Sequence, residues 1–418
     1  MRFAPGLAPL RHRDFALYFT GLTVSQCGSW MEQTLTTWLL YDITGSPVLL
    51  GIGGALRAVP IFTFGLLAGA IADRVDRRRL LLITQSGSAL TSLGLGLVVA
   101  TGQVQVWHIY VASIVNATLQ AFDAPARRAM YTTMVPRSQM QNAITLNAAV
   151  FRIARLVGPS LAGILIVTTG PAMPYFVNAV SFLAIIGALL LMGRPPIVDR
   201  VRGSLWAETI DGVRYTLGKR ILANLLFLES IHSLFGANTA LVTIVAKDVL
   251  HVGPDGLGFL LSALGAGALV GTGALVMSGD VEQKGRSMML SGYGYVASFA
   301  VFAWSRSYEL SAVTLAAVGF ADTWWATMRN SIFQLQADEA YRGRTLSAFL
   351  LVGRGMAQTS QLQTGLAVEA FGPAVAATAG AALIAVAIVG VNARDDEVRR
   401  FRDPRPAIGG PPTDAAAS

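Results

Sequence analysis

Charged residues, cysteine and histidine are all scarce in this chain. Of its 418 residues only 13% are charged and 53% are apolar, whereas a soluble domain usually carries about 25% charged residues. The single cysteine, Cys27, excludes an internal disulfide and a cysteine-rich zinc site, and the four histidines lack metal-ligand spacing. We therefore expect an integral membrane protein without a metal or other cofactor.

Sequence motifs of several enzyme classes are also absent. The chain has no G-x-x-x-x-G-K-S/T loop for nucleotide phosphates, no H-E-x-x-H zinc pair and no G-x-S-x-G nucleophile turn. ATP bound at a P-loop of its own is thus excluded as the energy source. The basic residues, which give a formal net charge of +8, occur in short clusters between apolar segments. This arrangement argues against nucleic-acid binding.

Twelve stretches are long and apolar enough to be predicted transmembrane helices. A hydrocarbon core about 30 Å thick requires roughly 20 apolar residues at about 1.5 Å each. The first stretch follows Arg11 and Arg13 and exceeds the length of a signal-peptide core, so we expect it to remain as the first span. The predicted spans are 15–42, 47–71, 80–101, 106–126, 140–168, 172–192, 221–246, 256–277, 287–304, 309–331, 345–367 and 373–393.

Arginine and lysine are concentrated in alternate loops, which predicts the orientation of the spans. One set of loops contains nearly all of them, and the other set holds few, with Lys247 and Arg306 as the exceptions. Because basic loops stay on the cytoplasmic side, both termini are predicted to be cytoplasmic and the number of spans to be even.

The predicted spans form two sets of six, separated by a polar stretch. The last residues are rich in proline, glycine and alanine and are predicted to be disordered. The predicted units are a first six-helix bundle (1–192), a cytoplasmic linker (193–220), a second six-helix bundle (221–393) and a tail (394–418).

The linker can form an amphipathic helix from Ser204 onward. Trp206, Ile210, Val213 and Leu217 would share one stripe of this helix. Such a stripe predicts a connector that lies on the cytoplasmic surface of the membrane.

The two sets of spans repeat the same residues at nearly constant spacing. Gly51, Asp73 and Arg79 match Gly258, Asp280 and Arg286 at an offset of 207, and Arg152, Gly163 and Gly170-Pro171 match Arg354, Gly365 and Gly372-Pro373 at an offset of 202. Two groups of matches in the same order rarely arise by chance. The predicted fold is therefore an all-α membrane protein whose twelve transmembrane helices form two pseudo-symmetric six-helix bundles, as in transporters whose halves rock about a central site.

The turn between the second and third predicted spans carries a specific motif. It reads Gly69-Ala70-Ile71-Ala72-Asp73-Arg74-Val75-Asp76-Arg77-Arg78-Arg79, and a degenerate copy, Gly279-Asp280 to Gly285-Arg286, occupies the matching turn of the second half. This motif closely resembles the signature loop of the major facilitator superfamily, G-x-L-A-D-R-x-G-R-R/K, with Ile71 and Asp76 as departures. The resemblance covers essentially the whole chain and implies a secondary transporter rather than an enzyme.

Further stretches resemble the bacterial drug- and siderophore-exporter branch of the superfamily. They are Leu40 to Ser46, Asp211 to Tyr215, and Asn147 to Pro159, where Gly158, Pro159 and Gly163 are similar to a shortened antiporter packing motif. The branch implies a monomer of the bacterial inner membrane that exports small amphipathic or acidic molecules by alternating access and proton antiport. An uptake or lipid-flipping permease of the same fold stays open, as do, more distantly, a membrane enzyme and a channel.

The resemblance also implies a role for the signature loop, which contains Gly69 and Arg74. In the superfamily its aspartate, here Asp73, faces a helix N-terminus, where free backbone N–H groups favour an anion. Its arginine, here Arg77, pairs with an acidic residue at the end of span four, here Asp123. Together they would latch the halves in the outward-open state, although control of topology by positive charge is the alternative.

Glu32 and Arg57 are ionisable residues inside predicted spans, where a charge is costly unless it faces a cavity or a partner. They lie 13 residues before and 12 residues after Gly45 in the first outer turn, so both sit about 18–20 Å from that turn. An ion pair is therefore possible. It could release Arg57 when Glu32 takes up a proton, or it could be a permanent packing contact.

Other ionisable residues inside the spans are further candidates for proton or substrate contacts. Arg152 and Arg354 are repeat mates, Glu229 and His232 share one helix face, and Asp322 precedes two tryptophans. Together with aromatic residues they would form a cavity of mixed charge, suited to an amphipathic or acidic metabolite; helix packing alone is the alternative. The candidates in this group are Arg152, Arg155, Glu229, His232, Asp322 and Arg354.

Overall fold

The computed structural model describes residues 5–131, 133–193, 205–339 and 341–403. Within these ranges the chain forms helices and connecting turns without a β-strand, which confirms the all-helical class. Residues 1–4, 132, 194–204, 340 and 404–418 lie outside the description. The helices are α1 (Arg13–Thr44), α2 (Pro47–Leu56), α3 (Ala58–Arg74), α4 (Arg77–Ala100), α5 (Val106–Tyr131), α6 (Met140–Thr169), α7 (Met173–Leu191), α8 (Leu205–Gly218), α9 (Arg220–Phe235), α10 (Thr239–Ile244), α11 (Pro254–Met277), α12 (Lys284–Trp304), α13 (Tyr308–Gln336), α14 (Arg342–Phe371), α15 (Pro373–Arg394) and α16 (Asp396–Arg400), with short turns η1 (Pro5–Arg11), η2 (Arg137–Gln139) and the π-helical η3 (Val245–Val249).

The sharp turn between α1 and α2 follows directly from its residues. Gly45 ends α1 in the left-handed conformation, with φ of 58°. The Ser46 hydroxyl accepts a hydrogen bond from the Leu49 N–H (3.3 Å), and Pro47 is the first residue of α2. These residues reverse the chain and start the next helix within two positions.

Two repeat mates share one unusual backbone conformation. Gly170 ends α6 with φ of 89° and ψ of 170°, and Gly372 ends α14 with φ of 79° and ψ of 163°. Residues with a side chain rarely adopt this region. The turns after α6 and α14 are therefore equivalent in conformation as well as in sequence.

In the part of the chain that the structure describes, seven segments are long and apolar enough to cross a membrane by length and composition alone. Several other long helices have a lower hydropathy because they contain ionisable or amide residues, such as Glu32 in α1 and Asp123 in α5. The seven segments are Pro47–Gly65, Arg77–Ala100, Arg137–Thr169, Met173–Leu191, Arg220–Val249, Pro254–Met277 and Pro373–Arg394.

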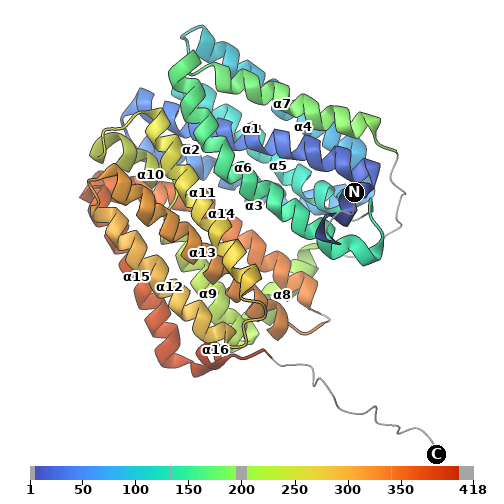
Figure 1. Cartoon of the computed structure of the whole chain (residues 1–418), viewed down its shortest axis with the longest axis vertical. Coiled ribbons are helices and arrows are strands. Elements are labelled where there is room, and N and C mark those ends of the chain that lie inside the picture. Colours follow the sequence, from blue (N-terminus) through green and yellow to red (C-terminus); the bar gives the residue numbers. More distant parts are fainter. Residues whose placement is uncertain (1–4, 132, 194–204, 340, 404–418) are drawn as a thin grey trace, which may run out of the picture.

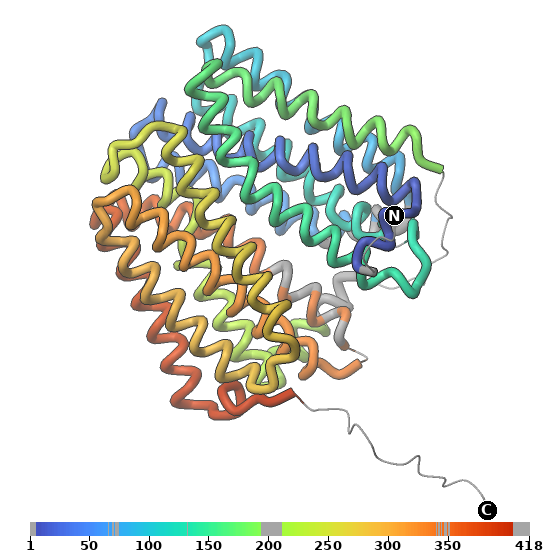
Figure 2. Tube along the Cα trace, in the orientation of Figure 1, coloured from blue at the N-terminus to red at the C-terminus, as the bar shows by residue number. Residues whose placement is uncertain are grey.

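Helices from the two halves of the sequence lie on different sides of the molecule. Figure 1 and Figure 2 show α1 to α7 (blue to green) together and α9 to α16 (yellow-green to red) together. The two groups pack against each other mainly through α6 with α11 and α2 with α14. This boundary between the groups is the place where a site shared by both halves can form.

The contacts across this boundary are themselves repeated. A methyl group at Gly163 in α6 would lie 2.6 Å from the carbonyl oxygen of Pro254 in α11, and Gly365 in α14 meets the carbonyl of Pro47 in α2 in the same way. Gly163 and Gly365 are 202 residues apart, and Pro47 and Pro254 are 207 apart, which are the two offsets of the sequence repeat. Small residues allow such close approach of helix backbones.

The second predicted half departs from regular spans at one place. The predicted span 221–246 is divided by Gly236 and by Asn238, which starts α10 by accepting a hydrogen bond from the Leu241 N–H (3.0 Å). The chain then passes into the π-helical turn η3, a feature often found at functional sites.

The predicted linker helix is present as α8, on the residues described. Trp206 and Ile210 of its predicted stripe have side chains outside the described part, Val213 is half-buried and Leu217 is 61% exposed. The ring of Tyr215 stacks on Tyr341 at 4.3 Å between centroids, which ties α8 to the start of α14.

The first part of the predicted tail (394–418) is folded, since Asp396–Arg400 forms the helix α16. Asp395 accepts a hydrogen bond from the Glu397 N–H (3.0 Å) and thereby starts α16, and Val398 and Phe401 are buried. Burial of these two apolar side chains explains why the segment up to residue 403 is packed on the helices. The remainder, 404–418, lies outside the described residues.

Candidate functional site

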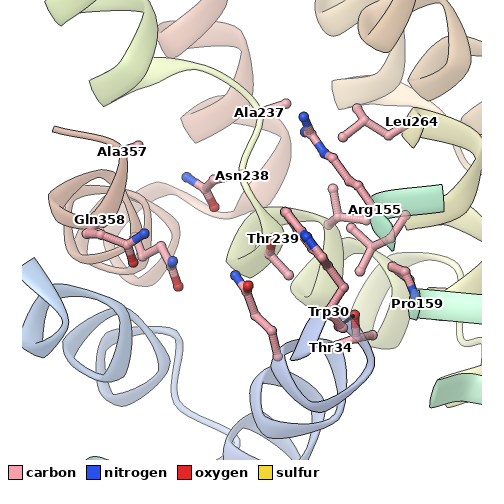
Figure 3. Close-up of a pocket in the computed structure, with 14 residues that line it drawn as sticks. Trp30, Thr34, Arg155, Pro159, Ala237, Asn238, Thr239, Leu264, Ala357 and Gln358 are labelled. Atoms are coloured by element: carbon pink, nitrogen blue, oxygen red, sulfur yellow. Dashed lines mark hydrogen bonds between the residues drawn. The ribbon is translucent and has the colours of Figure 1, made fainter. Parts of the chain in front are cut away.

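A cavity of about 160 Å³ lies between the two groups of helices. Figure 3 shows the fourteen residues that line it, and Arg155 is the only charged residue among them. They come from α1, α6, α10, α11, α14 and the connection between α9 and α10. We call this space the interface cavity; its lining is Trp30, Gln33, Thr34, Arg155, Pro159, Ala237, Asn238, Thr239, Val242, Leu261, Leu264, Ala357, Gln358 and Gln361.

Helix packing fixes the position of Arg155 in the interface cavity. The guanidinium lies over the ring of Trp30, 5.8 Å from its centroid. Gly158, one turn further along α6, allows the two helices to approach, since a methyl group there would lie 2.6 Å from Trp30 Cβ. Gly158 thus packs α6 on α1, whereas Gly163 packs α6 on α11.

The other polar groups of the interface cavity are mostly amides. Asn238 Nδ2 donates to Thr364 Oγ1 (2.7 Å), which links the start of α10 to α14. Gln33, Gln358 and Gln361 face the same space from α1 and α14, and no carboxylate is among the lining residues. One guanidinium surrounded by amides can bind an anionic group that also accepts and donates hydrogen bonds.

Glu32 lies beside this cavity in a separate polar cluster. Its side chain is 8% exposed and accepts hydrogen bonds from Ser92 Oγ, from Asn178 Nδ2 (2.5 Å) and from Asn116 Nδ2 (3.4 Å). The donors come from α4, α7 and α5, so three helices hold one carboxylate. All three donors are neutral.

The ion pair between Glu32 and Arg57 that the spacing allowed does not form within 4.0 Å in the part of the chain described. Instead, both residues line a cavity of about 50 Å³, and Arg57 sits at the break between α2 and α3. Gln33 lines this small cavity as well as the interface cavity. A change at the Glu32 cluster could therefore be transmitted to the interface cavity through one residue of α1.

A second cluster contains His232 and Asp322, with Glu229 nearby on the same helix as His232. His232 Nε2 lies 3.3 Å from Asp322 Oδ1, and its ring makes edge contacts with Tyr295 and Trp325 at 4.8 and 4.6 Å between centroids. Glu229 accepts a hydrogen bond from Ser233 Oγ at 2.9 Å.

Arg329, which the sequence reasoning missed, is the ion-pair partner of Glu229. Its side chain is 4% exposed and contacts the Glu229 carboxylate directly. The guanidinium also lies 5.4 Å from the ring centroid of Trp325 and 5.8 Å from that of Phe349. An arginine inside the predicted span 309–331 was the signal that could have identified it.

The remaining predicted arginines are not brought into these clusters. Arg152 is half-buried, and its buried Nη1 has no hydrogen-bond partner among the described residues. Arg354 is exposed. Neither residue lines the interface cavity.

Only some residues of the predicted latch have side chains in the described part of the chain. The side chains of Gly69, Asp73 and Arg74 lie outside it. Asp123 is buried, pairs with Arg127 (2.9 Å) and accepts a hydrogen bond from Gln85 Nε2 (2.6 Å).

Arg77, the predicted partner of Asp123, contacts the backbone of α5. Arg77 Nη1 donates to the carbonyl oxygen of Ala129 (3.3 Å) in α5. This contact keeps the start of α4 next to the end of α5. A latch that joins Arg77 to Asp123 stays a prediction.

Lys247 joins the two groups of helices at the end of α1 farthest from Arg13. Its ammonium lies 2.5 Å from Asp42 Oδ1 and 5.6 Å from the ring centroids of both Trp38 and Tyr41. The Tyr41 hydroxyl also donates a hydrogen bond to Asp248. We call these five residues the Lys247 clamp; they link α1 to the π-helical turn η3.

Comparison with known sequences decides the family. The profile of the transmembrane secretion effector family matches residues 4–408 of this chain. The chain belongs to this family, within the major facilitator superfamily. Membership confirms that this is a membrane transporter and not an enzyme.

Two relatives of this transporter align over most of their length. The staphyloferrin A transporter of Staphylococcus aureus (strain NCTC 8325 / PS 47) is 23% identical over 368 residues, which cover 85% of this chain and 89% of that protein. The enterobactin exporter EntS of Citrobacter koseri (strain ATCC BAA-895 / CDC 4225-83 / SGSC4696) is 23% identical over 372 residues, or 88% and 89% of the two chains. The predicted resemblance to siderophore exporters is thereby confirmed.

Solved transporter structures share the fold. The nucleoside transporter NupG superposes with a TM-score of 0.71, at 14% identity, over 92% of this chain and 98% of its own. A bacterial homologue of the human lysosomal transporter Spinster superposes with a TM-score of 0.70, at 14% identity, over 94% and 99% of the two chains. Both agree with a multi-pass membrane fold.

Proposed function

We propose that this protein is a secondary active transporter that exports small acidic molecules, siderophore-like or drug-like in chemistry, by alternating access and proton antiport. The observation that carries this proposal is the interface cavity, whose only charged lining residue is Arg155. Arginine binds carboxylates through paired, charge-assisted hydrogen bonds. The names of the relatives, a staphyloferrin A transporter and an enterobactin exporter, support a siderophore-like substrate.

The proposed architecture is twelve transmembrane helices in two six-helix bundles. In this assignment α2 and α3 form one span despite the break at Arg57, and α9, α10 and η3 form another. The matched contacts of Gly163 with Pro254 and of Gly365 with Pro47 support two pseudo-symmetric halves. The proposal includes residues 1–192 and 221–393 as the bundles, in a monomer of the bacterial inner membrane with both termini cytoplasmic.

We infer the direction of access to the interface cavity from the place where the halves meet. The Lys247 clamp and the glycine contacts hold the two halves together near the last residues of α1. In the proposed orientation this end of α1 is the outer end. The interface cavity would then be reached from the cytoplasm, as loading of an export substrate requires. The signature loop with Asp73 would latch the opposite ends together in the outward-open state.

The proposed proton site is Glu32. A charged carboxylate inside the membrane is costly, the three hydrogen-bond donors around Glu32 are neutral, and Arg57 lines the same small cavity without forming an ion pair with it in the described part of the chain. Glu32 would exchange a proton as the halves rock, and Gln33 would connect this exchange to the interface cavity. Glu229 is the weaker choice because Arg329 already pairs with it.

Transport into energised inside-out vesicles tests this function. Hydroxycarboxylate and catechol siderophores, with an uncharged dye for comparison, would be supplied with and without a proton uncoupler. Wild type should accumulate an acidic compound only when the gradient is intact. Arg155→Gln should raise the half-saturating concentration about ten- to a hundredfold, because a hydrogen bond to a charged group contributes about 1.5–3 kcal/mol.

The controls separate substrate binding from coupling. Arg152→Gln, on the same helix but outside the lining, should transport like wild type, and Arg155→Lys should keep part of the affinity. Glu32→Gln should bind substrate but lose uncoupler-sensitive accumulation. Unchanged transport by Arg155→Gln would show that the interface cavity is not the substrate site, and no gradient-driven movement of any compound would overturn the exporter proposal.

A further inference from the structure

A second large cavity lies away from the boundary between the halves, where α16 packs on the start of α12. It has a volume of about 340 Å³ and is lined by six residues, four of which are arginines and none of which is acidic. We call it the arginine cavity. Its lining is Gln283, Arg286, Arg399, Arg400, Phe401 and Arg402.

Backbone contacts hold the two walls of the arginine cavity together. The Gly285 N–H donates to the carbonyl oxygen of Phe401 (3.2 Å), and the Asp403 N–H donates to the carbonyl oxygen of Glu282 (3.0 Å). A side chain at Gly285 would collide with the backbone of Val398 and of the residue after it. The close docking of this segment is therefore built into the sequence at Gly285.

A buried lysine fixes the same junction. Lys284 is 6% exposed; its ammonium donates to Asp280 Oδ1 (2.9 Å) and to the Asp403 carboxylate. Burial alone would lower the pKa of Lys284, but the hydrogen bonds to Asp403 and Asp280 outweigh it and raise this pKa. Because the carboxylates of Asp280 and Asp403 pair with Lys284, they neutralise the charge of the arginine cavity less.

The charge of the arginine cavity is poorly balanced by the protein. Arg400 pairs with Asp396 at 2.5 Å, and both side chains are largely exposed. Arg286, Arg399 and Arg402 form no ion pair within 4.0 Å with any residue in the described ranges. Several guanidinium groups around one space repel each other unless an anion with several oxygen atoms lies between them.

We propose that the arginine cavity binds the phosphate of an anionic phospholipid headgroup. It lies where the start of α12 and the end of α15 meet α16, on the side that the proposed orientation assigns to the cytoplasmic membrane surface. Basic pockets at this level attract anionic lipids, and arginine binds phosphate oxygens in pairs. A lipid with two phosphates, such as cardiolipin, matches the three unpaired arginines better than a lipid with one.

Lipid binding to the purified full-length protein tests the proposal without any transport assay. Native mass spectrometry and thermal unfolding in detergent would compare cardiolipin, phosphatidylglycerol and phosphatidylcholine, with inorganic phosphate as the soluble probe. Wild type should retain cardiolipin most strongly and phosphatidylcholine least. Arg286→Gln with Arg402→Gln should weaken cardiolipin binding about thirtyfold, since each arginine near a membrane surface contributes about 1 kcal/mol.

Arg306→Gln is the matched control, because Arg306 is an exposed arginine at the other end of α12. This control should bind cardiolipin like wild type. If the double variant is unstable, the single variant Arg402→Gln should show an intermediate loss of cardiolipin binding. Equal cardiolipin binding by wild type and the Arg286/Arg402 variant would overturn the proposal. Stabilisation by inorganic phosphate that cardiolipin cannot exceed would also overturn it, in favour of a soluble phosphate compound.

Discussion

Lys247 Nζ lies 2.5 Å from Asp42 Oδ1, and this pair joins the last turn of α1 to the π-helical turn η3 of the other half of the sequence. Lys247 is one of the exceptions to the distribution of basic residues that predicts the orientation of the chain. Its position in the Lys247 clamp gives a structural reason for the exception. The charge of Lys247 at this end of the molecule links the two halves through Asp42.

We predict that removing the clamp shifts the protein toward the outward-open state. A partly exposed ion pair contributes up to about 1 kcal/mol, so Lys247→Ala should raise outward exposure of the interface cavity up to about fivefold. The reporter is Thr239→Cys in a Cys27→Ser background, labelled from outside by a membrane-impermeant maleimide. Asp42→Lys with Lys247→Asp should restore the wild-type rate. Equal labelling of Lys247→Ala and of the Arg306→Ala control would contradict a clamping role.

The Glu229–Arg329 pair is predicted to be structural. Glu229→Gln leaves a buried guanidinium without its charge partner, which should lower the free energy of unfolding by about 3–5 kcal/mol. Replacing both partners by Leu and Met should cost much less, because an apolar pair leaves no buried charge. Thermal unfolding in detergent measures both. Glu32→Gln is the comparison and should cost less than about 1.5 kcal/mol, because an amide keeps an acceptor for neutral donors. A smaller loss for Glu229→Gln than for Glu32→Gln would reverse the two roles.

The close contact at Gly163 is predicted to be required for the two halves to meet. Gly163→Val would place side-chain atoms against the backbone of Pro254 and should lower stability by about 1–3 kcal/mol and reduce transport. Gly187→Ala in α7 is the control, because no heavy atom lies within 4 Å of the added methyl group. That substitution should be neutral or stabilise by up to about 1 kcal/mol through helix propensity. Equal behaviour of the two variants would exclude close packing at Gly163 as the cause.

We predict that the contribution of the Lys219–Asp338 ion pair to stability does not change with pH across the neutral range. Their side chains lie 2.7 Å apart next to α8. The hydrogen bond from Lys219 lowers the pKa of Asp338, and the hydrogen bonds to Asp338 and Tyr215 raise the pKa of Lys219. The Asp338 contribution is lost only as pH falls below about 4, and the Lys219 contribution only as pH rises above about 10. Asp338→Asn should therefore lower the melting temperature equally at pH 5.5 and 8.5. A loss that appears at only one of these pH values would show that one partner titrates in this range.

The interface cavity and the two polar clusters show which site residues can be predicted from the sequence alone. Arg155, Glu229, His232 and Asp322 were identified as candidates because an ionisable residue inside an apolar stretch is conspicuous on its own. The partner of each ionisable residue could not be predicted in the same way. Glu32 lies with Ser92 and the side chains of α5 and α7 rather than with Arg57, because the rotation of each helix about its axis selects the partner.

The sequence by itself determined the helical membrane class, the family, the turns at Gly45, Gly170 and Gly372, and the repeat, because each depends on local composition or on a short motif. Only the tertiary structure decided which residues meet across the halves. It placed Arg155 as the only charged residue that lines the interface cavity, paired Arg329 with Glu229 and brought Lys247 against Asp42. The physical reason is that these contacts depend on the tilt and rotation of helices that are far apart in the chain, and side-chain packing at the shared boundary fixes both.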